Sequence, residues 1–68
     1  MTRLITSRNT SRPDEVFEAL AALHEGLSEG ACRQAEARLL LLLANHIGDE
    51  AVIREAVALA RKGLETTA

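Results

Sequence analysis

The sequence predicts an all-α fold of three helices, near residues 13–26, 29–47 and 50–62, with the middle helix central. Three observations predict this fold. Five consecutive leucines stand mid-chain, and leucine is a strong helix former without the β-branching that favours strands. Glycines and capping residues separate segments of helical length. In the two outer segments, apolar residues recur at the three- and four-residue spacing of amphipathic helices.

Residues 1–12 are predicted to form a flexible basic arm. They contain three arginines and no acidic residue, and Leu4 and Ile5 are their strongly apolar members. Chain ends of this kind are mobile unless they dock on the folded part. The arm is therefore either a tether for a partner or a frayed terminus, and a single domain is expected over residues 13–65.

The first helix is predicted to begin at Pro13 and to end at Gly26. Proline suits the first helical turn, where its missing N–H would have no partner, and glycine suits the left-handed residue that ends a helix. The apolar face is expected to contain Val16, Leu20, Leu23 and Leu27. Acidic residues occupy the opposite face.

The middle helix is predicted to begin after the N-cap Ser28 and to stop at Gly48. With Leu39 at the centre of the inward face, the same face receives Cys32, Ala35, Leu42, Leu43 and His46. Leu41 then lies nearly opposite. A helix that is apolar almost all round is buried almost all round, and two neighbours in a chain of 68 residues cannot easily enclose it.

The third helix is predicted to begin after the N-cap Asp49 and to end at Gly63. Its inward face is expected to contain Ile53, Ala56, Val57, Ala60 and Leu64, with Val52 and Leu59 on the flanks. The very short connection at Gly48 makes the second and third helices neighbours that are antiparallel or sharply crossed.

Composition excludes several classes of protein. The apolar run from Leu39 to Ala44 is far shorter than the roughly 20 residues of a membrane span. A net charge of −2 argues against a general nucleic-acid binder. The one cysteine, Cys32, fits a reducing compartment, and the first residues lack the apolar run of a signal peptide, so a cytoplasmic location is expected.

Two groups of residues could support chemistry. His24, Cys32 and His46 are the only soft metal ligands, but zinc needs three or four, and Cys32 and His46 lie about four turns apart on one predicted helix. Asn45, His46 and Asp49 could form a polar cluster for acid–base catalysis. Helix capping explains their residue types without catalysis, so no catalytic, metal or cofactor site is predicted. The alternative is a small enzyme or metal binder that uses His46 and its neighbours.

A second alternative is a weak DNA-binding helix-turn-helix. Its recognition helix would be the third helix, which offers Arg54, Arg61 and Lys62 to the nucleic acid. The acidic residues of the same segment offset these cations, so no nucleic-acid partner is expected.

The surplus of apolar surface on the middle helix predicts a protein interface. Ala37, Leu40, Leu41 and Ala44 face away from the first core, and their small alanines would let a second helix approach closely. Exposed apolar patches of this kind mark interaction sites. We therefore expect oligomerisation to complete the domain, either as a homodimer or by docking on a larger protein.

The segment Ala44-Asn45-His46-Ile47-Gly48-Asp49, with the preceding leucines and the following Ala51-Val52-Ile53-Arg54-Glu55-Ala56, resembles a family of very short bacterial proteins of unknown function. Residues 13–20 and 24–28 are similar to the first half of that family. The resemblance implies no catalytic residue. Because members of the family are often encoded beside flavin-dependent aromatic hydroxylases and similar catabolic enzymes, it implies an accessory subunit of such an enzyme.

Overall fold

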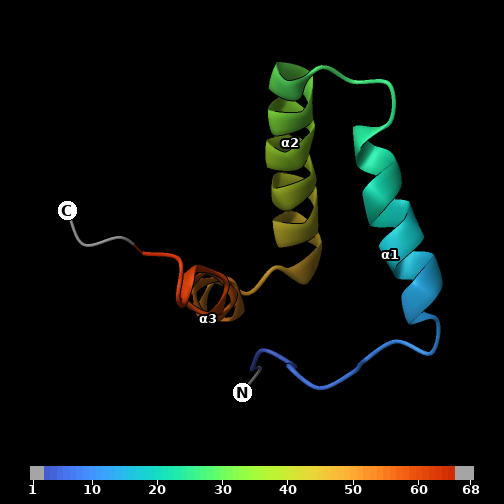
Figure 1. The fold of residues 1–68 in the computed structure, drawn as a ribbon. Coiled ribbons are helices and arrows are strands. Elements are labelled where there is room, and N and C mark those ends of the chain that lie inside the picture. Colours follow the sequence, from blue (N-terminus) through green and yellow to red (C-terminus); the bar gives the residue numbers. More distant parts are fainter. Residues whose placement is uncertain (1–2, 66–68) are drawn as a thin grey trace.

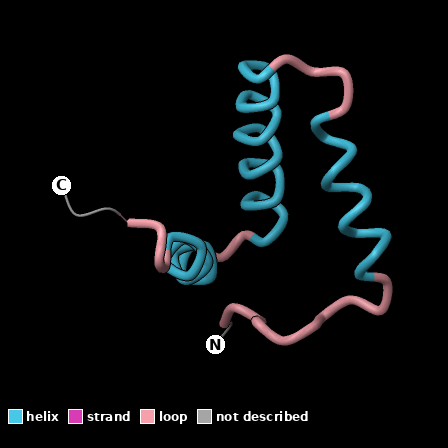
Figure 2. Tube along the Cα trace, viewed as in Figure 1, coloured by secondary structure: helices cyan, strands magenta, loops and turns pink. Residues whose placement is uncertain are grey.

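The computed structural model describes residues 3–65, and it is all-α over that range (Figures 1 and 2). Its helices are α1 (Pro13–Ala21), α2 (Glu29–Ile47) and α3 (Glu50–Arg61), and a 3₁₀ turn, η1 (Ala22–His24), follows α1. The predicted three-helix fold is therefore confirmed.

The first helix is shorter than the predicted range of 13–26. Pro13 does open α1, but the α-helical hydrogen bonding ends at Ala21 and tightens into η1. Glu25 then has extended backbone angles, and Gly26 adopts the positive φ of 72°. Helix ends commonly tighten in this way before the chain turns. Gly26 therefore shapes the turn after the helix rather than ending the helix itself.

The predicted bounds of α2 and its caps are confirmed. The Ser28 hydroxyl accepts a hydrogen bond from the backbone N–H of Ala31 at 3.2 Å. At the other end Gly48 has a φ of +69°, and its N–H donates to the carbonyl of Ala44 at 2.9 Å. Only glycine adopts this left-handed conformation without steric cost, so the helix stops there.

Asp49 caps α3, as the sequence predicts. One of its carboxylate oxygens accepts from the N–H groups of Ala51 at 2.9 Å and Val52 at 3.3 Å. Because Gly48 and Asp49 alone separate α2 from α3, the direction of α3 is set by these two residues. In Figure 1, α2 lies in the plane of the view while α3 is seen almost end-on, so the two helices cross sharply at the C-terminal end of α2.

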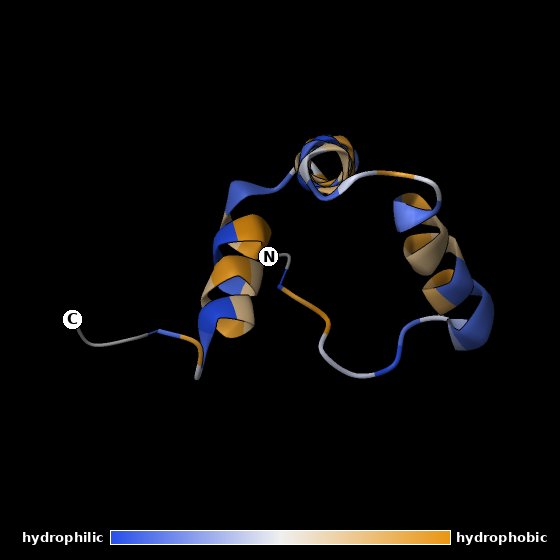
Figure 3. Cartoon of the chain, turned by 45° about the horizontal axis from the view of Figure 1, so that its top comes forward, coloured by the Kyte–Doolittle hydropathy of each residue, from blue (hydrophilic) through white to orange (hydrophobic). Residues whose placement is uncertain are grey.

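The three helices form an open arch rather than a closed bundle (Figure 3). α1 and α2 run side by side in opposite directions, but no Cα atom of α1 lies within 8 Å of one in α2 or α3. In the described part of the chain, the helical elements that come that close to α2 are η1 and α3. The radius of gyration is 14.1 Å. A compact domain of this length has a radius of gyration of about 11 Å.

The open arrangement corrects several predicted inward positions. Cys32, Ala35 and Leu39 are half-buried as expected. However, Leu42 is 69% exposed, and His46 is also exposed. These two residues were expected to close a core beneath α1, and α1 stays too far from α2 for that core to form.

The inward face of α3 is also rotated from the predicted one. Val52, expected on the flank, is 6% exposed and is the one buried side chain in residues 3–65. Ile53 and Ala56 are half-buried, whereas Val57 and Leu64 are exposed. Because α2 and α3 cross sharply at Gly48, the N-terminal part of α3 faces α2, and its C-terminal part does not.

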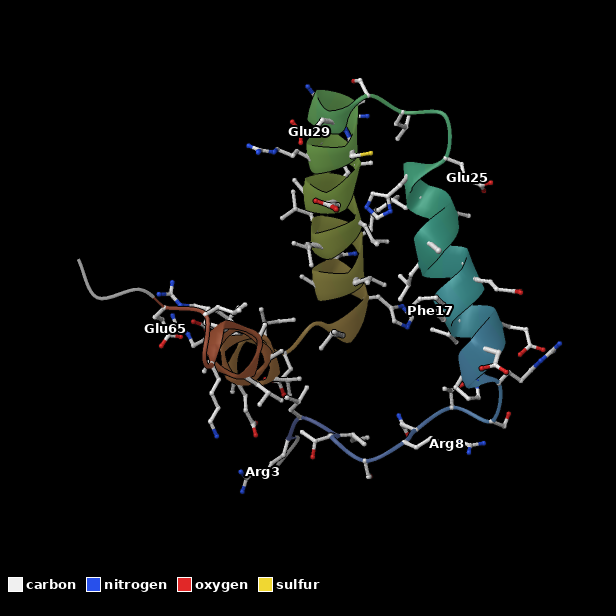
Figure 4. The ribbon with its side chains drawn as sticks, viewed as in Figure 1. Arg3, Arg8, Phe17, Glu25, Glu29 and Glu65 are labelled. Carbon is white, nitrogen blue, oxygen red and sulfur yellow. The ribbon has the colours of Figure 1, made fainter. Side chains whose placement is uncertain are left out.

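The N-terminal segment crosses the mouth of the arch and reaches α3. The backbone N–H of Leu4 donates to Oε1 of Glu55 at 3.3 Å, and Nη2 of Arg3 lies 3.6 Å from Oε2 of the same residue. Figure 4 shows Arg3 beside α3, and Arg8 on the extended segment that leads toward α1. The predicted arm therefore touches the folded part at Arg3 and Leu4, while Met1 and Thr2 lie outside the described residues.

Candidate protein-interaction surface

An apolar groove lies between the C-terminal half of α2 and the face of α3 that crosses it. Its volume is ≈ 410 Å³, and every side chain that lines it is apolar. The lining residues are Leu40, Leu41, Leu43, Ala44, Ile47, Ile53, Ala56 and Val57. We call this feature the α2–α3 groove. Its lining contains no group that could transfer a proton or attack a substrate, so what it offers a partner is apolar surface.

Three of the four predicted interface residues line this groove. Leu40 is 67% exposed and Leu41 73% exposed, so both keep most of their side-chain surface open. Ala44 lies between them and the crossing, and it is half-buried. Ala37 is exposed one turn before Leu41 and is not part of the lining.

Sequence reasoning missed the wall that α3 contributes. Ile53, Ala56 and Val57 were assigned to an inward core face, yet they form the second side of the groove. The periodicity of α3 did mark them as one apolar face. The spacing of apolar residues does not specify the angle at which α3 crosses α2. The turn at Gly48 and the packing of the buried Val52 determine that angle.

A second recess lies between the end of the first helical segment and α2. It has a volume of ≈ 340 Å³, and its lining includes two polar residues, Gln34 and Arg38. The apolar lining residues are Leu23, Leu27, Ala31, Ala35, Leu39 and Leu42. This recess is where the predicted core between the first two helices stays open to solvent.

One polar contact joins the two sides of that recess. Nε2 of His24 lies 2.7 Å from Oε2 of Glu36, so η1 is held against α2. The hydrogen bond to the Glu36 carboxylate raises the pKa of His24 above its ordinary value, and the negative charge of that carboxylate adds to the increase. The thiol of Cys32 lies nearby, 3.9 Å from the carbonyls of His24 and Leu27, beyond the range of a strong hydrogen bond.

The residues considered for chemistry lie at opposite ends of α2, with His24 and Cys32 near its start and the other three near its end. Asp49 uses its carboxylate to cap α3, and His46 and Asn45 are exposed near the end of α2. Cys32 and His46 lie roughly 21 Å apart along the same helix. Over residues 3–65, no group of three or more His, Cys, Asp and Glu side chains is placed to hold a metal ion.

The arginines of α3 are engaged by carboxylates of the same segment. Arg54 donates to Glu50 at 2.7 Å, and Arg61 lies 3.9 Å from Glu65. Carboxylates this close to the arginines reduce the positive potential that attracts phosphates. Also in the described part of the chain, no helix has both the length and the apolarity needed to cross a bilayer.

A comparison with models of known protein families identifies the family of this chain. The model of the family described as "Protein of unknown function (DUF2783)" matches residues 4–62. The chain belongs to this family. The resemblance to a family of unknown function is thereby confirmed, and the match to DUF2783 takes in all three helices and most of the N-terminal segment. No curated protein and no solved structure matches the chain.

Proposed function

We propose that this protein is a non-catalytic interaction module, which acts by burying the α2–α3 groove against a helix of another polypeptide. The observation that supports the proposal most directly is the exposure of Leu40 and Leu41 beside a wholly apolar recess. A helix that presents such a face in water is normally covered by a partner.

The total exposed surface supports the same conclusion. The chain exposes 6321 Å². A compact monomer of its mass, 7.3 kDa, exposes about 4,200 Å². The excess is therefore roughly 2,000 Å² by this relation, and part of it belongs to the extended N-terminal segment. The helices contribute to the remainder, because large apolar side chains on α1, α2 and α3 are exposed. Figure 3 shows apolar residues along α1 and α3.

The partner is either a second copy or a larger enzyme to which the protein is an accessory subunit. The family resemblance supports the second possibility and points to flavin-dependent catabolic enzymes. In that role the module would bind the enzyme through apolar contacts and would not supply catalytic groups, because the groove lining contains none. We place this activity in the cytoplasm, where a half-exposed thiol such as Cys32 stays reduced.

The proposal is tested by photo-crosslinking in the native cell. A photoreactive amino acid at position 41 should give a covalent adduct with a protein, because the side chain there is expected to be covered. The matched control is position 59 on α3, whose leucine is 52% exposed and lines neither recess. Equal labelling at both positions, or labelling at neither, would contradict the proposal.

A further inference from the structure

We propose that the occupant of the α2–α3 groove is the N-terminal half of α2 from a second copy, so that two copies pair with their α2 helices antiparallel. This inference rests on the proposed function and specifies the partner and the geometry. In such a two-fold pair, the half of α2 that α3 leaves bare fills the groove of the other copy, and the reverse contact forms at the same time.

The bare half of α2 has the shape that the groove requires. Gly30 and Ala37 lie on the same side of the helix as Leu41 and Ala44, because residues seven apart return to nearly the same angle. A Cβ atom built on Gly30 would meet nothing within 4 Å, so the face is open at this residue. Small residues at such positions let the partner's leucines pack close to the backbone.

Charge favours the antiparallel direction. Arg33 lies on the same face, and no carboxylate lies within 4.0 Å of its guanidinium in the part of the chain that the structure describes. If the two-fold axis passes between Leu40 and Leu41, Arg33 of one copy lies opposite residue 48 of the other. It therefore approaches Asp49, whose carboxylate caps α3, and Glu50, which is paired with Arg54 on the exposed surface. A parallel pair would instead place the two Arg33 side chains together, which like-charge repulsion opposes.

The available area suits a stable dimer. If each copy covers even half of its excess surface, the pair buries roughly 2,000 Å² in total, which is at the lower bound for obligate homodimers. A loosely bound peptide would cover much less of it. The bare half of α2 and the α2 wall of the groove belong to the same helix, so a second copy supplies both halves of the interface at once.

The first experiment measures the mass of the purified protein alone by light scattering. We expect twice the chain mass of 7.3 kDa. Leu41→Glu should give a single chain, while the matched variant Leu59→Glu should stay paired. Because Leu41→Glu could disturb folding, Arg33→Glu gives a second test at an exposed position, and it should weaken pairing about three- to tenfold. A wild-type mass of one chain would overturn the inference.

The second experiment determines the direction of pairing. Glu29 lies at the exposed start of α2 (Figure 4), so a spin label at Glu29→Cys in a Cys32→Ala background reports the distance between the two helix starts. Antiparallel pairing places the labels about 35 Å apart along the helices, from a rise of 1.5 Å per residue. A distance under about 20 Å indicates parallel pairing and overturns the geometry.

The two proposals fail in distinguishable ways. A single-chain mass together with a crosslink from position 41 to a different protein would overturn the pairing while supporting the interaction module. The absence of any crosslink at position 41 would overturn the interaction module. A crosslinked product of two identical chains, with labels far apart, supports both.

Discussion

Truncating Leu41 should destabilise the protein more than truncating Val52, although Val52 is the buried residue. In one chain alone the order would be the reverse, since Leu41 is 73% exposed and Val52 only 6% exposed. The comparison of Leu41→Ala with Val52→Ala therefore tests whether the α2–α3 groove is covered in solution.

The magnitudes follow from the carbon atoms removed. A buried methylene contributes about 0.8 kcal/mol. Val52→Ala removes two carbons and, after the better helix propensity of alanine, should cost about 1–1.5 kcal/mol per chain. Leu41→Ala removes three, so at its present exposure the cost is only about 0.6 kcal/mol. If an interface covers Leu41, the cost rises to about 2.4 kcal/mol per chain, because all three carbons then leave water.

The assay is urea unfolding followed by circular dichroism at several protein concentrations. Unfolding of a dimer depends on concentration, and each tenfold dilution should lower the apparent stability by about 1.4 kcal/mol per dimer. Wild type and Val52→Ala should show this dependence, and Leu41→Ala should show less of it at low concentration.

Two results would refute the reasoning. One is a Leu41→Ala protein that unfolds at nearly the wild-type urea concentration while Val52→Ala unfolds much earlier. The other is a wild-type midpoint that stays the same over a hundredfold range of concentration. Either result would mean that water remains in the groove.

Three further outcomes are expected. Because the pKa of His24 is raised, its pairing with Glu36 stabilises the fold fully below pH 6.5, the ordinary histidine pKa. This stabilisation is lost as the pH rises through the raised pKa. His24→Gln should therefore lower the melting temperature more at pH 6 than at pH 8.5. Asp49→Ala removes the acceptor of two backbone N–H groups and should cost about 1 kcal/mol in thermal unfolding, whereas an unchanged midpoint would argue against the cap. Glu55→Ala removes the acceptor of the Leu4 N–H and should make trypsin cleave the N-terminal segment faster, with little change in global stability. Equal cleavage rates in the variant and the wild type would show that this contact does not hold the segment.

Local chemistry made the helices predictable. Ser28, Gly48 and Asp49 each satisfy or redirect backbone groups at a helix end, and these effects depend on neighbours within four residues. The bounds of α2 could therefore be predicted from sequence alone. The end of α1 was harder, because its last turn tightens into η1 and no cap residue marks that change.

The packing of the helices could not be predicted in the same way. Periodicity placed Leu42 on the face toward the first helix, where it lines the open recess but remains 69% exposed. It placed Val52 on a flank, and Val52 is buried. Which side of a helix is covered depends on the distance and crossing angle of its neighbours, and the periodicity of a single helix specifies neither. For the candidate surface, sequence identified the α2 side through Leu40, Leu41 and Ala44, while the α3 side depends on the crossing at Gly48.

The small core explains why association and folding should be coupled in this protein. A single buried side chain within residues 3–65 cannot offset the conformational entropy of ordering three helices, which is about 1–2 kcal/mol per residue before side chains are counted. Short helices are marginal in water without tertiary packing, and α1 has only nine residues. The apolar side chains needed to balance this cost are present, but they line the groove and the recess instead of a closed core. A partner that fills the groove would therefore supply much of the stability of the helices that form it.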